Sequence, residues 1–316
     1  MRIVAAAERL GYRPNATARA LAQGRANAIG VVVNNLDLIG HTNIYFLEVF
    51  GGVIEGALAA GQITVVFTLR DWDEAAQRIP AFCDRRVDGL ILIAPMLKQG
   101  AADWMPAHAG FVSVHGNCAI PGVVNLESDE EAGAFDMVSH MLALGHRRIL
   151  HVGGPVGATG AERRIAGYLR AHAAAGVEPP PGHVLRASFS EEGGRVALQD
   201  WLLRHRGSPL PEAVFGANDA IAMGCIDVLH ARRLRVPADV SVVGFDDTLL
   251  ARSARIATVQ QPLHDLGSQA VRVLMDRIDS IQDGRNWHGQ DNIVLPTTIV
   301  PRATLAAPRR KTLVID

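Results

Sequence analysis

Residues 29–33, Ile29-Gly30-Val31-Val32-Val33, are the stretch that decides the fold. A run of small and apolar residues of this length indicates a strand that is buried on both faces, as in a parallel sheet. The pattern then predicts a helix over 46–60 and a second strand over 63–67, and strands and helices continue to alternate. This alternation predicts an α/β protein with doubly wound parallel sheets.

The length of the chain indicates more than one compact unit. At 316 residues it exceeds what a single hydrophobic core usually organises, so we expect two lobes. A composition of 48% apolar and only 5% aromatic residues predicts cores of Ala, Val, Leu and Ile, and it excludes disorder and a coiled coil. A second strand-helix series follows the strand at 149–152, which predicts the first crossing between the lobes at Gly153-Gly154-Pro155. The pattern leaves open which lobe receives the helix after Pro262 and the strand at 298–300.

Charge is distributed unevenly along the chain. The formal net charge is −1, yet the first 27 residues contain five arginines and one glutamate. A small basic head on a mildly acidic body indicates contact with a polyanion at the N-terminal end.

The cysteines and the apolar segments restrict the cellular location. Cys83, Cys118 and Cys225 are odd in number and widely spaced, so we expect neither a disulfide framework nor a CxxC metal site. The sequence has no secretory signal pattern and no apolar run near the ~18 residues of a membrane span. It therefore predicts a cytoplasmic protein without membrane contact.

The common enzyme signatures are missing from this sequence. The segment 153–160 lacks the Lys-Ser/Thr of a P-loop, and GxGxxG, GxSxG and HExxH patterns do not occur. We therefore predict a binding protein with no catalytic residue, metal or cofactor. Polar residues such as His115, Asn218 and Asp246 follow the predicted strands, where they would line a cleft between the lobes for a small polar molecule.

Several ordered strings resemble one family, the LacI/GalR bacterial transcription regulators. The resemblance runs from about Arg2 to Thr304. The matching strings are Leu10-Gly11-Tyr12-Arg13-Pro14-Asn15, Ala18-Arg19-Ala20-Leu21, Val87-Asp88-Gly89-Leu90-Ile91, Leu144-Gly145-His146-Arg147-Arg148-Ile149, Arg164-Ile165-Ala166-Gly167-Tyr168, Ala217-Asn218-Asp219, Val236-Pro237-Ala238-Asp239-Val240-Ser241-Val242-Val243-Gly244-Phe245-Asp246-Asp247 and Gln261-Pro262.

The resemblance implies a DNA-binding headpiece, a hinge helix and a two-lobed core similar to periplasmic sugar-binding proteins. It also implies that the helix after Gln261-Pro262 returns to the first lobe. The expected domains are the third headpiece helix at 1–14, the hinge helix and linker at 15–27, the first lobe at 28–153 plus 262–290, the second lobe at 154–261 plus 291–305, and a C-terminal tail at 306–316.

The resemblance further implies operator DNA as a partner. In the family, paired hinge helices insert a leucine wedge into the minor groove. Leu21 matches that wedge, with packing on a dimer mate as the alternative, Asn15 matches the hinge cap, and Tyr12, Ala18 and Arg19 lie in the matching DNA-binding segment. Because the sequence begins inside the third headpiece helix, without the two helices of the helix-turn-helix, we expect this 316-residue form to bind DNA weakly and with little specificity.

The resemblance also implies a set of effector-binding residues. Among them, the guanidinium of Arg164 could hold hydroxyl or carboxylate oxygens in a bidentate manner. Glu130 stands where the family usually has Asn, and 34–42 is atypical, so the identity of the effector stays open. For the aromatic candidates the alternative is helix packing, and for Asp129, Asn218 and Asp246 it is helix capping. The full set is Tyr45, Phe46, Asp129, Arg164, Phe189, Asn218 and Asp246.

The resemblance therefore predicts a cytoplasmic, effector-responsive transcription regulator, a repressor, that is not an enzyme. A small sugar or sugar-like effector would change the angle between the lobes and thereby control operator binding. The segment after Thr304 lacks leucine heptads, so we expect a homodimer without a tetramerising tail. The alternative is a sugar-binding solute-binding protein without DNA-binding activity, which should carry an export signal and no basic hinge.

Overall fold

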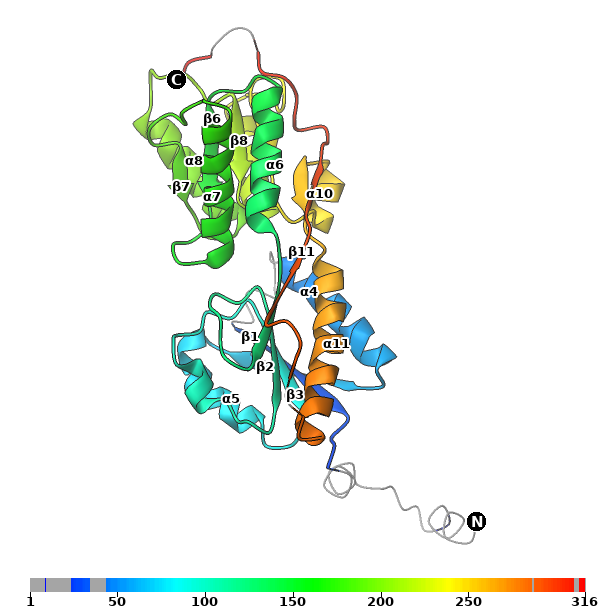
Figure 1. Ribbon diagram of the computed structural model, residues 1–316. Coiled ribbons are helices and arrows are strands. Elements are labelled where there is room, and N and C mark those ends of the chain that lie inside the picture. Colours follow the sequence, from blue (N-terminus) through cyan, green and yellow to red (C-terminus); the bar gives the residue numbers. More distant parts are fainter. Residues whose placement is uncertain (1–8, 10–23, 35–43, 286, 310–312, 316) are drawn as a thin grey trace.

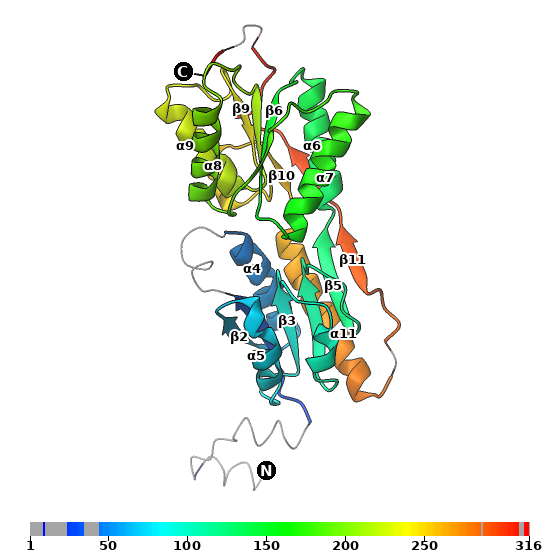
Figure 2. The ribbon, with the colours of Figure 1, turned by 90° about the vertical axis from the view of Figure 1, so that its left-hand side faces the viewer.

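The computed structural model describes residues 9, 24–34, 44–285, 287–309 and 313–315. Two α/β lobes are stacked end to end along one long axis (Figures 1 and 2). Each lobe has a parallel sheet with helices on both faces, which confirms the predicted fold class.

The first lobe contains a six-stranded sheet in the order β11-β5-β4-β3-β1-β2, and all neighbouring pairs are parallel. Ile29, Val31 and Ile91 are completely buried because helices cover both faces of these strands. Helices α4 and α11 pack on one face, and α5 with the short η2 packs on the other. The bounds are β1 Ala28–Asn34, α4 Ile44–Ala59, β2 Ile63–Leu69, η1 Trp72–Glu74, α5 Ala75–Phe82, β3 Gly89–Ile93, η2 Ala101–Trp104, β4 Gly110–Val114, β5 Val123–Ser128, α11 Leu263–Gln282 and β11 Asn292–Leu295.

Helices α4 and α11 approach each other closely through two glycines. A Cβ atom on Gly52 would overlap the backbone oxygen of His264, and one on Gly267 would overlap that of Val49. The missing side chains allow the two backbones to touch, and α11 is fixed in the first lobe as the family resemblance implied.

The second lobe contains a four-stranded parallel sheet in the order β7-β6-β8-β9. Helices α6 and α7 pack on one face around Met137, Tyr168 and Phe215, and α8 and α9 pack on the other around Trp201 and Cys225. The bounds are α6 Glu130–Ala143, β6 Ile149–Gly153, α7 Thr159–Ala174, β7 Val184–Arg186, α8 Glu191–Arg204, β8 Ala213–Gly216, α9 Asp219–Ala231, β9 Ser241–Val243, α10 Leu249–Ala254, β10 Thr258–Gln260 and β12 Thr298–Val300, of which β10 and β12 form an antiparallel pair.

The first crossing between the lobes is not at 153–155, where the alternation of elements placed it. Strand β6 pairs with β7 and β8, and α6 packs against α7, so both β6 and α6 belong to the second lobe. The chain therefore crosses at 128–130, directly after β5. An apolar strand followed by a helix gives no indication of which sheet it joins, which explains the error.

The assignment of 291–305 to the second lobe is also wrong for its first part. Strand β11 pairs with β5 at the edge of the first sheet, where the Asn292 amide donates to Glu127 at 3.0 Å. The chain crosses once more after Leu295, and the remaining crossing lies at 260–262. In the described part of the chain, three segments thus connect the lobes.

The residues before β1 are fastened to the first lobe. The backbone N–H groups of Ala26 and Asn27 donate to the two carboxylate oxygens of Asp88 at 2.7 and 2.8 Å, and Arg25 pairs with Asp279 at 2.6 Å. This junction lies at the end of the first lobe that faces away from the second (Figure 1).

The described part of the segment taken as a tail, residues 313–315, packs on the second lobe. Ile315 is buried, and its N–H donates to the Ser208 carbonyl at 3.0 Å.

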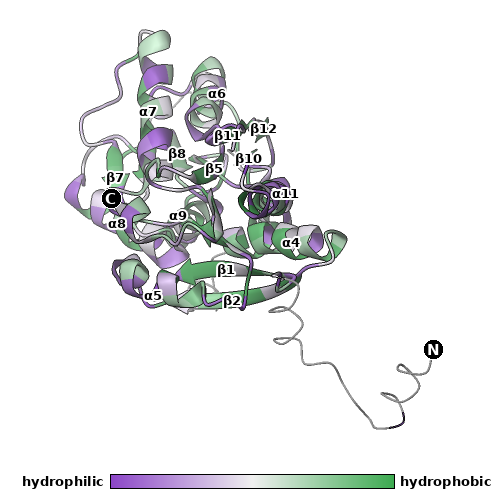
Figure 3. Ribbon diagram, turned by 60° about the horizontal axis from the view of Figure 1, so that its bottom comes forward, coloured by the Kyte–Doolittle hydropathy of each residue, from purple (hydrophilic) through white to green (hydrophobic). Residues whose placement is uncertain are grey.

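Apolar residues concentrate on the strands and the inner sides of the helices, as strands β1 and β2 in Figure 3 illustrate. Among the described helices, none is long and apolar enough to cross a bilayer.

Candidate binding site between the lobes

Arg164 on α7 is the centre of a buried polar cluster. Its side chain is only 6% exposed. Nη2 pairs with Glu130 Oε1 at 2.6 Å and lies 3.5 Å from Asp246 Oδ1, while Nη1 donates to the Ala217 carbonyl oxygen. The Phe245 ring lies under the guanidinium, 4.1 Å from Cζ. Arg164 Nε has no hydrogen-bond partner within the described residues, so the guanidinium keeps one donor free.

Glu130 reaches Arg164 because of how α6 and α7 begin. Asp129 caps α6 by accepting a hydrogen bond from the Ala132 N–H at 3.0 Å, and Glu130 is the first helical residue. In the first turn of α7, a Cβ atom on Gly160 would overlap the Glu130 carboxylate. The glycine therefore leaves the space that Glu130 occupies, and the positive end of the α7 dipole favours an anion there.

Asp246 follows β9 in a left-handed backbone conformation, with φ of 109°. It accepts a hydrogen bond from Gln261 Nε2 at 2.5 Å. Burial raises the pKa of the Asp246 carboxyl to about 8, although the neighbouring Arg164 charge opposes the shift. Asp219, nearby and also buried, is held by the hydroxyls of Thr248 and Thr258, and burial raises its pKa to about 6.

A chain of hydrogen bonds continues from Gln261 into the first lobe. Ser128 Oγ donates to Gln261 Oε1, and the Ser128 N–H donates to His115 Nε2 at 3.1 Å. Because Nε2 accepts, the Nδ1–H of His115 donates to the Tyr45 hydroxyl at 2.6 Å. The network therefore connects both lobes through two of the three crossing segments.

Burial also governs the ionisation of the first-lobe members of this network. It lowers the pKa of His115, which keeps the imidazole neutral. It raises the pKa of Tyr45 well above the ordinary value, and the charges of Glu130 and Asp246 add to this shift. Tyr45, at the start of α4, therefore stays a protonated phenol.

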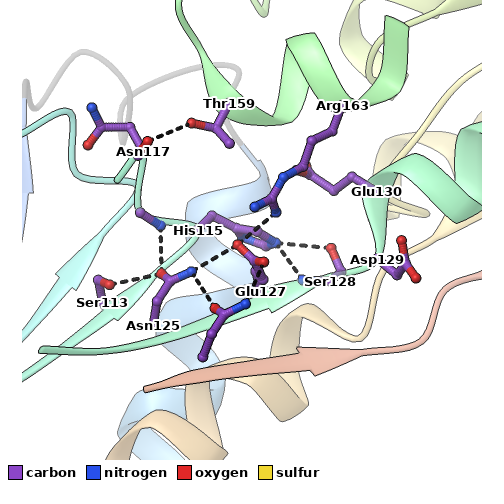
Figure 4. Close-up of polar contacts among 12 residues, drawn as sticks. Ser113, His115, Asn117, Asn125, Glu127, Ser128, Asp129, Glu130, Thr159 and Arg163 are labelled. Carbon is purple, nitrogen blue, oxygen red and sulfur yellow. Dashed lines mark hydrogen bonds and ion pairs between the residues drawn. The ribbon is translucent and has the colours of Figure 1, made fainter. Parts of the chain in front are cut away.

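A second set of contacts, which we call the outer cluster, connects α7 directly to the first lobe (Figure 4). Arg163 pairs with Glu127 on β5 at 2.7 Å, and Asn125 and Asn292 also donate to Glu127. Burial alone would raise the pKa of Glu127, but the hydrogen bonds from Arg163 and Asn292 outweigh it and lower the pKa.

The structure brings several of the expected effector residues together. Arg164 and Asp246 are in contact, and Tyr45 joins them through the hydrogen-bond chain. Phe189 lies beside the guanidinium with 5.8 Å between Cζ and the ring centre. Asn218 follows Ala217, and its Oδ1 caps α9 by accepting from the Ile221 N–H at 2.8 Å.

Three expected residues occupy the alternative positions. Asp129 is exposed and caps α6, Asn218 caps α9, and Phe46 packs in the apolar core of the first lobe. The expected DNA-contacting residues lie outside the described residues; they are Tyr12, Asn15, Ala18, Arg19 and Leu21.

Sequence reasoning missed three participants in the cluster. Glu130 was noted only as a departure from the family pattern, and Phe245 and Gln261 were quoted only within matching strings. Each of the three directly neighbours an expected site residue or a crossing between the lobes. Their position just after a strand could therefore have identified them from the sequence.

The arrangement suits recognition of hydroxyl groups. Carboxylates accept hydrogen bonds, while Arg164 and the Gln261 and Asn218 amides can donate them. Within the described residues, no group of three His, Cys, Asp or Glu side chains could hold a metal ion.

Comparison with known proteins gives consistent matches. Residues 138–305 match a family described as a periplasmic binding protein-like domain. The ribose operon repressor of Escherichia coli (strain K12) is 31% identical over 88% of this chain and 83% of the repressor. A lac repressor dimer bound to operator and the anti-inducer ONPF superposes with a TM-score of 0.79 at 26% identity, covering 96% of this chain and 89% of that one. A complex of the transcriptional regulator CelR with cellobiose gives a TM-score of 0.77 at 26% identity, with the same coverage.

Proposed function

The chain belongs to the LacI family of transcription regulators, whose members are repressors rather than enzymes, and we propose that it represses transcription under the control of a small sugar-like effector. The effector binds at the Arg164 cluster, and operator DNA binds at the N-terminal segment. The protein acts in the cytoplasm, where operator DNA is found.

The observation that carries this proposal is the polar network that joins the lobes. A ligand hydrogen-bonded to Arg164 and Asp246 in the second lobe is connected through Gln261 and Ser128 to His115 in the first. Because these groups come from both lobes, a ligand that reorganises them favours one angle between the lobes over another. Such differential binding is what allows a ligand to shift a conformational equilibrium.

The DNA-binding assignments follow from the same family. We assign 1–14 to the headpiece and 15–27 to the hinge and linker, with Leu21 as the minor-groove wedge. The basic character of this segment suits a polyanion. The hydrogen bonds to Asp88 support the assignment, because they attach Ala26 and Asn27, the last residues of the linker, to the first lobe.

A second copy of the chain is the proposed partner of α4. Leu47, Ile54 and Leu58 are 54%, 47% and 77% exposed and lie on one face of this helix, at i, i+7 and i+11. Exposed apolar stripes of this kind mark protein interfaces. We expect Leu58→Asp to convert a dimer into a monomer in sedimentation equilibrium; an unchanged dimer would place the interface elsewhere.

The proposal is tested by measuring whether a ligand changes DNA affinity. A sugar panel is screened by thermal shift against wild type and Arg164→Met, and each hit is added to a fluorescence-anisotropy titration with DNA from upstream of the gene. We expect a hit that is lost in Arg164→Met and that changes DNA affinity at least fivefold, a common size of allosteric coupling. A hit that leaves DNA affinity unchanged would instead identify a solute-binding protein.

A further inference from the structure

The charge balance around Arg164 differs from that of a site built to hold an anion. One guanidinium faces two acidic side chains, Glu130 at 2.6 Å and Asp246 at 3.5 Å. Both carboxyl groups are at most 5% exposed, and the buried Asp219 carboxyl adds to the negative potential at Asp246. Even with Asp246 protonated, the positive charge of Arg164 is already balanced by Glu130.

Glu130 is a built-in part of this balance and not a mobile surface side chain. It is the first residue of α6, and its carboxylate lies in the space left by Gly160 at the start of α7. Moving it away from Arg164 would separate a buried ion pair, which is costly because each charge would lose its partner in a poorly solvated place. A ligand carboxylate or phosphate therefore cannot easily replace it.

The remaining hydrogen-bonding capacity of the site fits hydroxyl groups. Carboxylate oxygens accept from O–H donors, and Arg164 Nε is a buried donor without a partner within the described residues. A hydroxyl can do both, since it donates one hydrogen bond and accepts others. An anionic group can only accept, and it would add a further negative charge beside Glu130.

Building on the effector site proposed above, we infer that it takes a neutral polyhydroxylated ligand and rejects phosphorylated or carboxylated ones, with Glu130 as the specificity-determining residue. A second negative charge at the position of the ligand is unfavourable because Glu130 has already neutralised Arg164. The preference is a property of this chain's own acidic residue and not of the arginine alone.

Matched ligand pairs test this charge preference. Neutral pentoses and hexoses, including D-ribose and D-glucose, are titrated by calorimetry beside their phosphate esters and sugar acids. For the wild-type protein, we expect at least one neutral sugar to bind at least about tenfold more tightly than its anionic counterparts, a difference of about 1.4 kcal/mol. Equal or tighter binding of the anionic member, or a panel without any neutral binder, would overturn the inference.

The variant Glu130→Gln keeps the shape of the side chain and removes its charge. We expect it to reduce the preference for the neutral member to less than about threefold, because Arg164 then has charge available for an anion. The matched control is Glu131→Gln on the same turn of α6, where Glu131 is 39% exposed and pairs with Arg170. The control should retain the wild-type preference, and an unchanged preference in Glu130→Gln would contradict the role of Glu130.

The two proposals can fail separately. If a neutral sugar binds with the expected preference but DNA affinity does not respond, the transcriptional role is wrong and the charge preference stands. If an anionic ligand proves to control DNA binding, the transcriptional role stands and the charge preference is wrong.

Discussion

Arg163 and Arg164 are neighbours on α7, but their partners belong to different parts of the molecule. Arg164 is 6% exposed, and its partners Glu130, Asp246 and the Ala217 carbonyl all belong to the second lobe. Arg163 is 34% exposed and pairs with Glu127 of the first lobe. If the lobes move apart, the contacts of Arg164 within the second lobe can be retained, whereas the ion pair between Arg163 and Glu127 must break.

The comparison separates ligand recognition from the relative placement of the lobes. A buried ion pair within one lobe shapes the site without depending on the angle between the lobes. A partly exposed pair across the lobes contributes little to folding but favours one angle over others. Two consecutive residues of one helix can therefore be substituted to test the two properties independently.

The largest difference is expected in global stability. Arg164→Met leaves Glu130 and Asp246 buried without their cation, so the free energy of unfolding should fall by about 3–5 kcal/mol. Arg163→Met should cost only about 1 kcal/mol, because Arg163 is 34% exposed and the amides of Asn125 and Asn292 still donate to Glu127. Urea denaturation measures both, and equal losses would show that the two arginines do not differ in this way.

Acid should destabilise the second lobe through His151. Burial lowers the pKa of this imidazole to about 4, with the Arg164 charge contributing. The unfolded chain takes up the proton near pH 6.5 and the folded chain does not, so stability is retained above pH 6.5 and falls by about 3 kcal/mol between pH 6.5 and 4. The measurement is the free energy of unfolding as a function of pH.

Substitutions of His151, Arg164 and Arg163 should change this pH dependence of stability in different ways. His151→Phe should remove the contribution of one proton to the slope of the unfolding free energy against pH. Arg164→Met should narrow the pH range over which stability is lost, because it raises the pKa of His151, while Arg163→Met should leave this range unchanged. A slope that survives in His151→Phe would mean that other histidines carry it.

The outer cluster should show its effect in ligand affinity. Each of the variants Arg163→Met and Glu127→Gln should bind effector up to about fivefold more weakly, because the arrangement of the lobes that this pair stabilises becomes less favoured. The double-mutant cycle should give a coupling energy of about 1 kcal/mol in effector binding. Calorimetry measures the affinity.

Arg170→Met is the matched control for this cycle, since Arg170 pairs with Glu131 between two helices of the same lobe. Its effector affinity should equal that of wild type. A comparable weakening in the control would contradict a specific role for the contact between the lobes.

The smallest effect is expected from Asp129→Ala. Loss of the cap should lower stability by about 1 kcal/mol, and effector affinity should stay the same because this carboxylate is exposed and bonded to the Ala132 N–H. A tenfold loss of affinity would instead return Asp129 to the ligand site, as the sequence resemblance implied.

The layered fold could be predicted from the sequence because buried parallel strands are nearly continuous apolar runs, as in 29–33. The crossing points could not, because β6 and α6 are apolar in the same way as their counterparts in the first lobe. Which sheet they join is decided by contacts between distant residues, such as Met137 with Tyr168 and Phe215.

The site was predicted in part for a similar reason. Arg164 and Asp246 lie in strings whose spacing is distinctive, and the structure brings them into contact. Asp129 and Glu130 are adjacent acids, and only the geometry of the α6 start determines that one caps the helix while the other turns toward Arg164.

The Asp88 junction also restricts how the sequence beside it can vary. Both of its hydrogen bonds are donated by backbone N–H groups, so they do not depend on which side chains stand at 26 and 27. Position 26 excludes proline, which has no N–H to donate, and its side chain packs against the core of the first lobe. Position 27 is narrower, because its φ of 53° favours asparagine or glycine. Substitutions at these two positions that keep the N–H groups and the backbone conformation should therefore keep the attachment to the first lobe.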